Sequence, residues 1–600
     1  MTTATLPRRS EIPVEFTWNL ESMYANNDLW QKDFEWVGER LPGIEAYRGH
    51  LSESAKMLFG ALKMQDEVGT KLESLAVYAQ MRKDEDNTNS TYVAMADRSM
   101  SLWAQFAGST SFITPEILEI PDEKLNSFLQ EEPNLRLYEH YIQQILREKA
   151  HIRSAEVEEV LAQSLEVGMG PGNIYNMFTN ADLKFPTIKD ADGNEVEVTK
   201  GRFIDFMESS DRRVRRDAYE VFYDTFGRYS NTIGSTYAAS VKKDIFYART
   251  HNYKSALEAA LSPENIPLEV YDSLVETVNR NLGLLHRYLH LRKKLLGVED
   301  LRPYDLYTPL IPQARKKFTY QEATDTVLQG LSVLGEDYVQ EVGKGIKSRW
   351  IDVYENIGKT SGAYSSGSFT SQPFILMNYQ DNLDSVFTLA HELGHSLHSL
   401  YTNRTQPFIY ANYSLFVAEV ASTTNEALLT HYLLGKTTDK EVRLYLINNE
   451  LEKFRGTLYR QTLFAEFERV AHTMVEEGQA LTPEKLNELY SDLIKRYYGP
   501  DLLVDDRISM EWMRIPHFYR AYYVYQYATG ISAATALSQQ MIQEGEPAVK
   551  RYRKFLTTGS SDYPTNLLAQ AGVDMTHPEP VQLALDYFNE LLSEMERLTA

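Results

Sequence analysis

Apolar residues recur at helical spacing along most of the chain. One stripe, with steps of four, three and four, is formed by Trp30, Phe34, Val37 and Leu41. Such a stripe gives a helix one face that packs against a core, and Pro42-Gly43 is expected to end this helix. Similar stripes cover residues 150–167, 213–226 and 262–296. The pattern therefore predicts a predominantly all-α fold.

Two segments break the helical pattern. Residues 184–189 and 195–199 flank Asp190-Ala191-Asp192-Gly193-Asn194, which predicts a β-hairpin. We expect a domain boundary just after it, with an N-terminal helical domain over residues 1–200 and a second helical domain over residues 201–600. The other break is the Gly- and Ser-rich segment 361–371, followed by the apolar run 373–379. That run predicts a short strand, and its first residue, Pro373, favours an edge strand.

One pentapeptide suggests chemistry: His391-Glu392-Leu393-Gly394-His395, within a predicted helix that begins near Asp384 or Ser385. Two imidazoles at i and i+4 lie on one helical face and can bind one zinc ion. A Glu beside the first His is the general base that metallopeptidases use on water. The pentapeptide therefore indicates a hydrolytic metal site, which needs a third protein ligand.

Two carboxylates on a following helix are candidates for the third ligand. The metzincin pattern is excluded, because His398 and Tyr401 occupy the positions where that class has Gly and His. The segment 415–434, capped by Ser414, predicts a helix that carries Glu419 and Glu426 on one face. Glu419 has apolar neighbours, so an unpaired carboxylate there would be costly to bury. Glu426 is the alternative ligand, or an acceptor for a ligating imidazole N–H.

Composition limits the partners and the compartment. With 61 Lys+Arg and 84 Asp+Glu, the formal net charge of −23 argues against nucleic acid and anionic membranes as partners. The chain has no Cys, which excludes thiolate metal sites and favours a reducing compartment. Residues 1–13 show no secretory signal, and the longest uncharged run, 521–543, is too polar to span a membrane. A cytoplasmic location is expected.

Several further segments resemble one family. They are Thr17-Trp18-Asn19-Leu20, Ser361-Gly362-Ala363-Tyr364, the stretch 388–399 around the pentapeptide, 416–422, 515–519 and 523–530. With the pentapeptide, they resemble the oligoendopeptidase F family of zinc oligopeptidases, in the thimet oligopeptidase and neurolysin superfamily, over essentially the whole chain. The resemblance implies a two-lobed helical fold with a deep central channel, one zinc ion per chain, and internal cleavage of short unstructured peptides.

The resemblance also implies roles for individual residues. It makes His391, His395 and Glu419 the zinc ligands and Glu392 the base that activates water. His517 and Tyr522 match the residues that contact substrate and stabilise the oxyanion. The superfamily's second tyrosine falls at Thr529. Tyr525 and Tyr527 are therefore candidates for its role. His398 and Gly362 are further candidate substrate contacts.

The sequence thus predicts a zinc-dependent endopeptidase, with residues 201–600 as its catalytic domain and short peptides as substrates. Two alternatives remain open at this point: a helical peptide-binding protein whose metal site is not catalytic, and a zinc exopeptidase. Another divalent metal could also serve in place of zinc, because affinity alone does not single zinc out.

Overall fold

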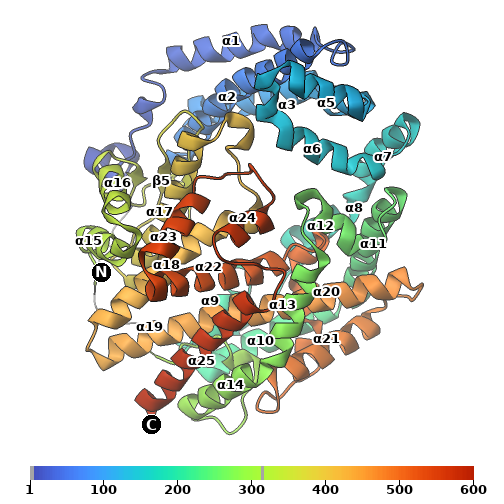
Figure 1. The fold of residues 1–600 in the computed structure, drawn as a ribbon. Helices are drawn as coiled ribbons and strands as arrows, with labels where there is room; N and C mark the ends of the chain where they lie inside the picture. Colours follow the sequence, from blue (N-terminus) through green and yellow to red (C-terminus); the bar gives the residue numbers. More distant parts are fainter. Residues whose placement is uncertain (1–5, 312–316) are drawn as a thin grey trace. The chain divides into compact units, whose positions relative to one another are not determined.

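The computed structural model describes residues 6–311 and 317–600, and nearly all of its regular structure is helical (Figure 1). The predicted all-α class is therefore confirmed. Within these two ranges, every helix is too short or too polar to traverse a lipid bilayer. The chain forms two compact units, and each is assembled from three separate stretches of sequence.

The first unit contains the described residues among 6–149, 317–435 and 537–572. Its helices are α1 (Asn27–Glu45), α2 (Ala55–Glu85), α3 (Ser90–Thr110), α4 (Ile113–Glu119), α5 (Asp122–Glu131), α6 (Glu139–Arg147), α15 (Tyr320–Gly330), α16 (Glu336–Lys347), α17 (Leu383–Thr405), α18 (Leu415–Lys436), α23 (Glu546–Phe555) and α24 (Pro564–Gln570).

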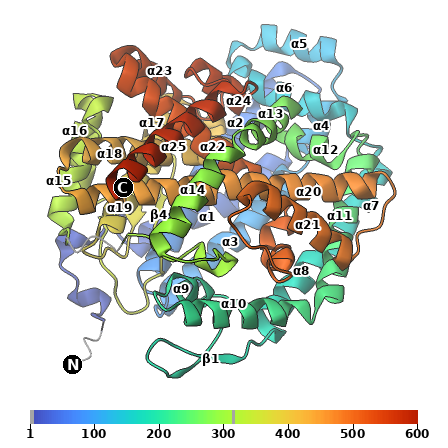
Figure 2. The ribbon, with the colours of Figure 1, turned by 90° about the horizontal axis from the view of Figure 1, so that it is seen from below.

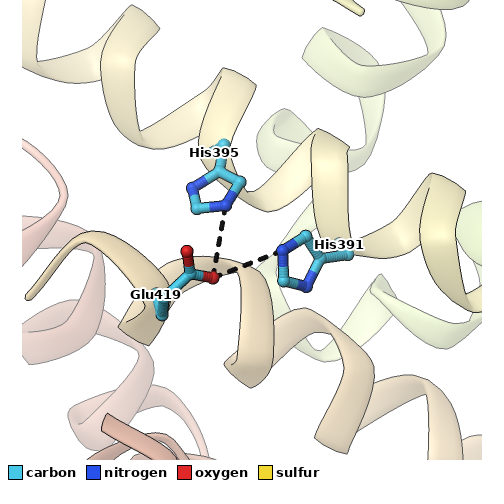
Figure 3. A group of neighbouring side chains, drawn as sticks. All are labelled: His391, His395 and Glu419. Carbon is cyan, nitrogen blue, oxygen red and sulfur yellow. Dashed lines mark ion pairs between the residues drawn. The ribbon is translucent and has the colours of Figure 1, made fainter. Parts of the chain in front are cut away.

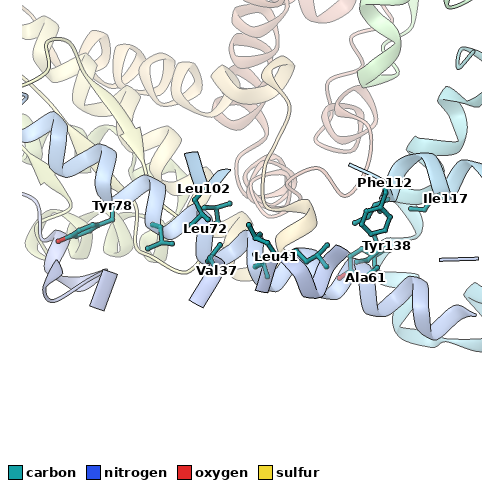
Figure 4. Packing of buried hydrophobic residues seen from close by; sticks show 14 of the residues in the cluster. Val37, Leu41, Ala61, Leu72, Tyr78, Leu102, Phe112, Ile117 and Tyr138 are labelled. Atoms are coloured by element: carbon teal, nitrogen blue, oxygen red, sulfur yellow. The ribbon is translucent and has the colours of Figure 1, made fainter. Parts of the chain in front are cut away.

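An apolar core holds the N-terminal helices of this unit together. Val37 and Leu41 of α1 are buried against α2 and α3 (Figure 4). Helix α1 continues through Pro42 to Glu45, so the predicted end at Pro42-Gly43 is wrong. Leu41 and Ile44, on either side of the proline, are both buried. Their packing offsets the backbone hydrogen bond that a proline inside a helix removes.

A three-stranded sheet completes the first unit: β3 (Ile351–Asp352), β4 (Tyr364–Ser366) and β5 (Phe374–Leu376), in the order β3-β5-β4. Strand β5 is parallel to β3 and antiparallel to β4. The prediction that this apolar run forms an edge strand is wrong, because β5 is the central strand and β4 lies at the edge. All three residues of β5 are buried, as expected for an apolar run with neighbours on both sides.

The second unit contains the described residues among 150–311, 436–536 and 573–600. Its elements are α7 (Ala155–Gly168), α8 (Gly170–Met177), β1 (Thr187–Lys189), β2 (Glu195–Glu197), α9 (Phe203–Glu208), α10 (Arg212–Gly227), α11 (Ser230–Thr250), α12 (Ala256–Leu261), α13 (Leu268–Arg280), α14 (Leu282–Leu296), α19 (Lys440–Lys453), α20 (Arg460–Glu476), α21 (Pro483–Tyr498) and α25 (Glu579–Thr599), together with the first part of α22 (Tyr525–Glu544).

The predicted hairpin is confirmed in the second unit. Strands β1 and β2 pair antiparallel, with Ile188 opposite Val196, beside α10 (Figure 2). Asp190 closes the turn, because its Oδ1 accepts the N–H groups of Asp192 and Asn194. Residue 200 falls inside this unit, and the division into domains over 1–200 and 201–600 stays a prediction.

Candidate active site

Two helices of the first unit, α17 and α18, carry the metal-binding candidates. Helix α17 begins at Leu383, and its cap is Asn382, whose side chain accepts the N–H of Ser385 at 2.9 Å. The predicted start near Asp384 or Ser385 is therefore one or two residues late. Helix α18 begins at Leu415, as predicted. About half of the residues in each helix are buried, so packing fixes how the two helices present their ligand faces.

The two helices approach closely at Gly394, inside the pentapeptide. A Cβ atom at this position would lie 2.6 Å from the Cα atom of Ser422 and 2.7 Å from the carbonyl oxygen of Ala421, both on α18. Only glycine permits that approach. One turn away, the buried side chain of Asn425 donates a hydrogen bond to the carbonyl oxygen of Ala390 at 3.1 Å. The helix pair is thus fixed at the point where the ligands face each other.

Three side chains converge across this contact: His391 and His395 from α17, and Glu419 from α18 (Figure 3). The Nε2 atoms of His391 and His395 lie 3.3 Å and 3.4 Å from the same carboxylate oxygen, Oε2 of Glu419. Ligands in a tetrahedral zinc site with Zn–N and Zn–O bonds of about 2.0–2.1 Å are about 3.3–3.4 Å apart. The donor set and its spacing therefore fit zinc.

Neighbouring side chains orient two of these ligands. Oε1 of Glu426 lies 2.6 Å from Nδ1 of His391, so His391 presents Nε2 toward Glu419. The Ser422 hydroxyl donates to Oε2 of Glu419 at 3.0 Å. Although burial lowers the pKa of His391, hydrogen bonds to Glu419 and Glu426 raise it to about 10. The carboxylates of Glu419 and Glu426 therefore create a negative electrostatic potential at the site, which favours the binding of a cation.

Glu392 lies beside the ligands, as a general base requires. Its side chain is 6% exposed, and burial raises its pKa. The backbone of Ser365, on the edge strand β4, donates a hydrogen bond to this carboxyl and opposes that rise. Its Oε2 atom is buried without a hydrogen-bond partner among the described residues. A buried carboxyl with one free oxygen can take up a proton.

The two other predicted substrate contacts of the first unit have different environments. His398 is 1% exposed and stacks parallel on Tyr413, with ring centroids 3.8 Å apart. These contacts are those of a packed core residue, and a contact with substrate stays a prediction. Gly362 lies in the exposed segment before β4, with a φ of +84° that favours glycine. Its carbonyl oxygen accepts a hydrogen bond from Asn378, and its role toward substrate also stays a prediction.

His517 and the candidate tyrosines belong to the second unit. The exposed ring of His517 is parallel to that of Tyr523, with centroids 5.8 Å apart, and its centroid lies 6.0 Å from that of Tyr527. The Tyr527 hydroxyl donates to the Tyr523 hydroxyl at 3.3 Å. Tyr522 and Tyr525 are 3% and 0% exposed and lie outside this group.

Tyr523 was not among the sequence candidates. Tyr523 lies just before α22, which begins at Tyr525, so helical spacing in the sequence does not single it out. The structure therefore groups His517 with Tyr523 and Tyr527, and separates it from Tyr522 and Tyr525.

Comparison with known proteins shows the family of this chain. The family model described as peptidase family M3 matches residues 205–587, and that described as oligopeptidase F matches residues 116–185. Oligopeptidase PepF of Bacillus subtilis is 51% identical over 593 residues, covering 99% of this chain and 88% of that protein.

Two crystal structures are similar along nearly the whole chain. One, of a protein from Chlamydophila abortus, has a TM-score of 0.94 and 33% identity, covering 99% of this chain and 100% of that one. The other, oligoendopeptidase-F from Enterococcus faecium, has a TM-score of 0.75 and 38% identity, covering 96% of this chain and 99% of that one.

Proposed function

The chain belongs to peptidase family M3, and from that premise we propose that it is a zinc-dependent endopeptidase that hydrolyses internal bonds of short, unstructured peptides. The observation that carries the proposal is the convergence of His391, His395 and Glu419 beside the buried carboxyl of Glu392. We further propose one zinc ion per chain. A cytoplasmic location stays a prediction.

The metal ligands and the base have separate tasks in this proposal. A zinc ion held by His391, His395 and Glu419 would act as a Lewis acid toward the scissile carbonyl and the attacking water. Glu392 takes the proton of the attacking water at its carboxyl and delivers it to the nitrogen of the leaving amine. The geometry supports this role, because the carboxyl lies beside the ligand histidines and its Oε2 atom has no hydrogen-bond partner among the described residues.

The edge strand β4 is the element we propose for holding the peptide backbone. Strand β4 pairs with β5 on one side, and its residue Ser365 faces Glu392. An extended peptide can add to such an edge through main-chain hydrogen bonds. Those bonds are independent of sequence, so they suit an enzyme for varied peptides. Gly362, close before the strand, leaves room for the peptide to pass.

We propose that His517 stabilises the oxyanion together with Tyr523 and Tyr527. Hydroxyl and imidazole donors supply hydrogen bonds to the charge that develops on the carbonyl oxygen. Tyr523 and Tyr527 are partly exposed and contact His517, whereas the ring of Tyr522 is 3% exposed. This grouping favours Tyr523 over Tyr522 as a donor.

The test combines a substitution with an internally quenched peptide whose termini are both blocked. The wild-type protein should cleave it, and Glu392→Gln should lower kcat about 10²- to 10⁴-fold while the zinc content stays the same. Retained turnover in Glu392→Gln would overturn the role of Glu392. Bound zinc without any cleavage would favour a peptide-binding protein, and cleavage only of peptides with free termini would favour an exopeptidase.

A further inference from the structure

Tyr522 has a strained backbone. Its φ is +53°, in the left-handed region, where the Cβ atom crowds the following carbonyl oxygen. Asn252, Asn265 and Arg349 share this conformation; Asn tolerates it through local hydrogen bonds, and the Arg349 side chain is held by the carbonyl oxygens of Thr17 and Trp18. A tyrosine has no such compensation. The surrounding structure must therefore hold Tyr522 in place, and strain of this kind is common at functional sites.

Glu468, on α20, supplies the contact that holds the backbone. Its Oε1 atom accepts the N–H of Tyr522 at 2.7 Å. The Glu468 side chain is 1% exposed, and its Oε2 atom is buried without a hydrogen-bond partner among the described residues. Burial raises the pKa of Glu468 well above its usual range. Burying a carboxyl with one unpartnered oxygen is costly, so general stability is a poor explanation for a Glu whose carboxyl accepts the N–H of a strained residue.

The ring of Tyr522 is held by the same helix. It lies against His472, also on α20, with centroids 4.8 Å apart, and edge-on to Tyr271 at 5.9 Å. His472 is itself fixed, because its Nδ1 atom bonds to the carbonyl oxygen of Glu468 at 2.9 Å and its Nε2 atom lies 3.4 Å from Asp244. Both the backbone and the ring of Tyr522 are therefore anchored to α20.

The next residue, Tyr523, faces the other way, toward His517. Its ring is nearly parallel to the imidazole, with an angle of 4° between the planes. The Arg520 guanidinium lies over the same ring, 4.2 Å from its centroid, and the Tyr527 hydroxyl bonds to the Tyr523 hydroxyl. The left-handed residue at 522 is the point where the chain turns between the buried ring and this exposed group.

We propose that Glu468 is a positioning residue for the peptidase reaction: by accepting the N–H of Tyr522 it holds the left-handed turn that sets Tyr523 against His517. The inference rests on the proposed function, because it assigns Glu468 to the hydroxyl and imidazole donors proposed above. Glu468 acts through Tyr523 and does not touch the substrate. It therefore affects the transition state more than the binding of peptide.

The first test compares two substitutions of Glu468 in the zinc-loaded protein. Glu468→Ala should lower kcat about 10- to 100-fold with little change in KM. Glu468→Gln should recover most of kcat, since its amide oxygen can accept the same N–H. The control is Glu466→Ala, on the same helix, which removes contacts to Tyr497 and Arg496. Wild-type kcat in Glu468→Ala, or equal losses in the Ala and Gln variants, would overturn the proposal.

A double-mutant cycle separates positioning from general stability. If Glu468 acts through Tyr523, Glu468→Ala should cost less than about threefold in kcat once Tyr523→Phe is present, because coupled sites are not additive. Fully multiplicative losses would contradict the proposal. An inactive wild-type protein, or an active Glu392→Gln variant, would instead overturn the proposed function.

A second pair of variants keeps the test decisive if Glu468→Ala does not fold. Tyr522→Asn and Tyr522→Val both remove the ring and the hydroxyl, but Asn tolerates the left-handed region and a β-branched residue does not. The Val variant should have a kcat at least about tenfold below that of the Asn variant. Equal values would mean that residue 522 acts through its side chain, and would overturn the role assigned to Glu468.

Discussion

Nδ1 of His391 and Oε1 of Glu426 lie 2.6 Å apart, so a carboxylate outside the ligand set fixes the orientation of one ligand. Partners of this kind typically account for about 10- to 100-fold in metal affinity. Glu426→Ala should therefore weaken zinc binding by about that factor, measured by competition with a chelating dye. Glu341→Ala is the matched control, because Glu341 also bonds to α17, at Arg404, but contacts no ligand. Equal affinities in the two variants would rule out this role for Glu426.

Gly394→Ala should damage the metal site without changing a ligand. The new Cβ atom would meet backbone atoms of α18 at 2.6–2.8 Å, so the helices would have to separate. Overpacking of this kind costs about 1–3 kcal/mol. We expect a lower Tm and loss of zinc, measured by calorimetry and metal analysis. Gly435→Ala should change neither, since a Cβ atom there has nothing within 4 Å.

Removal of the metal should abolish activity and lower the Tm. A ligand present at 1,000 times its Kd stabilises the folded state by about 4 kcal/mol. Dialysis against a chelator should therefore lower the Tm, and one equivalent of zinc should restore both Tm and cleavage. A Tm unaffected by the chelator would show that the metal is not bound to the folded state.

Asp66 should make stability depend on pH. Burial raises its pKa to about 6 in the folded protein, against an ordinary value of 3.8. The folded state thus keeps a proton that the unfolded chain has released, and this group's contribution to stability falls as pH rises from about 4 to about 6. Asp66→Asn, which can still accept from the Tyr138 hydroxyl, should raise the Tm more at pH 7.5 than at pH 5. An equal change at both pH values would contradict the shift.

The metal site was predictable because its information is local. His391 and His395 share a helix face by spacing alone, and the helix bearing Glu419 and Glu426 follows within thirty residues. Periodicity predicts both carboxylates as candidates, and the family resemblance selects Glu419. The order of the strands was not predictable in this way. A proline before an apolar run is compatible with an edge or with a strand start, and only the burial of β5 on both sides decides between them.

The tyrosines show a different limit. Tyr522 was selected by its distance from His517 along the sequence, which takes no account of backbone direction. A left-handed residue reverses that direction, and it arises from a hydrogen bond to Glu468, more than fifty residues earlier in the chain. No local pattern reports such a contact. Tyr523 precedes the first residue of α22, so a helical period does not predict that its ring lies beside His517 and Tyr527.

The close approach at Gly394 bears on whether this metal centre can be transplanted. The pentapeptide looks like a complete sequence motif, yet its fourth residue, Gly394, forms the backbone contact between α17 and α18. A graft that copied the histidines onto another scaffold would reproduce two donors and leave the third at the wrong distance. The unit of design is therefore a pair of helices in backbone contact, with glycine on one side and Ser422 on the other.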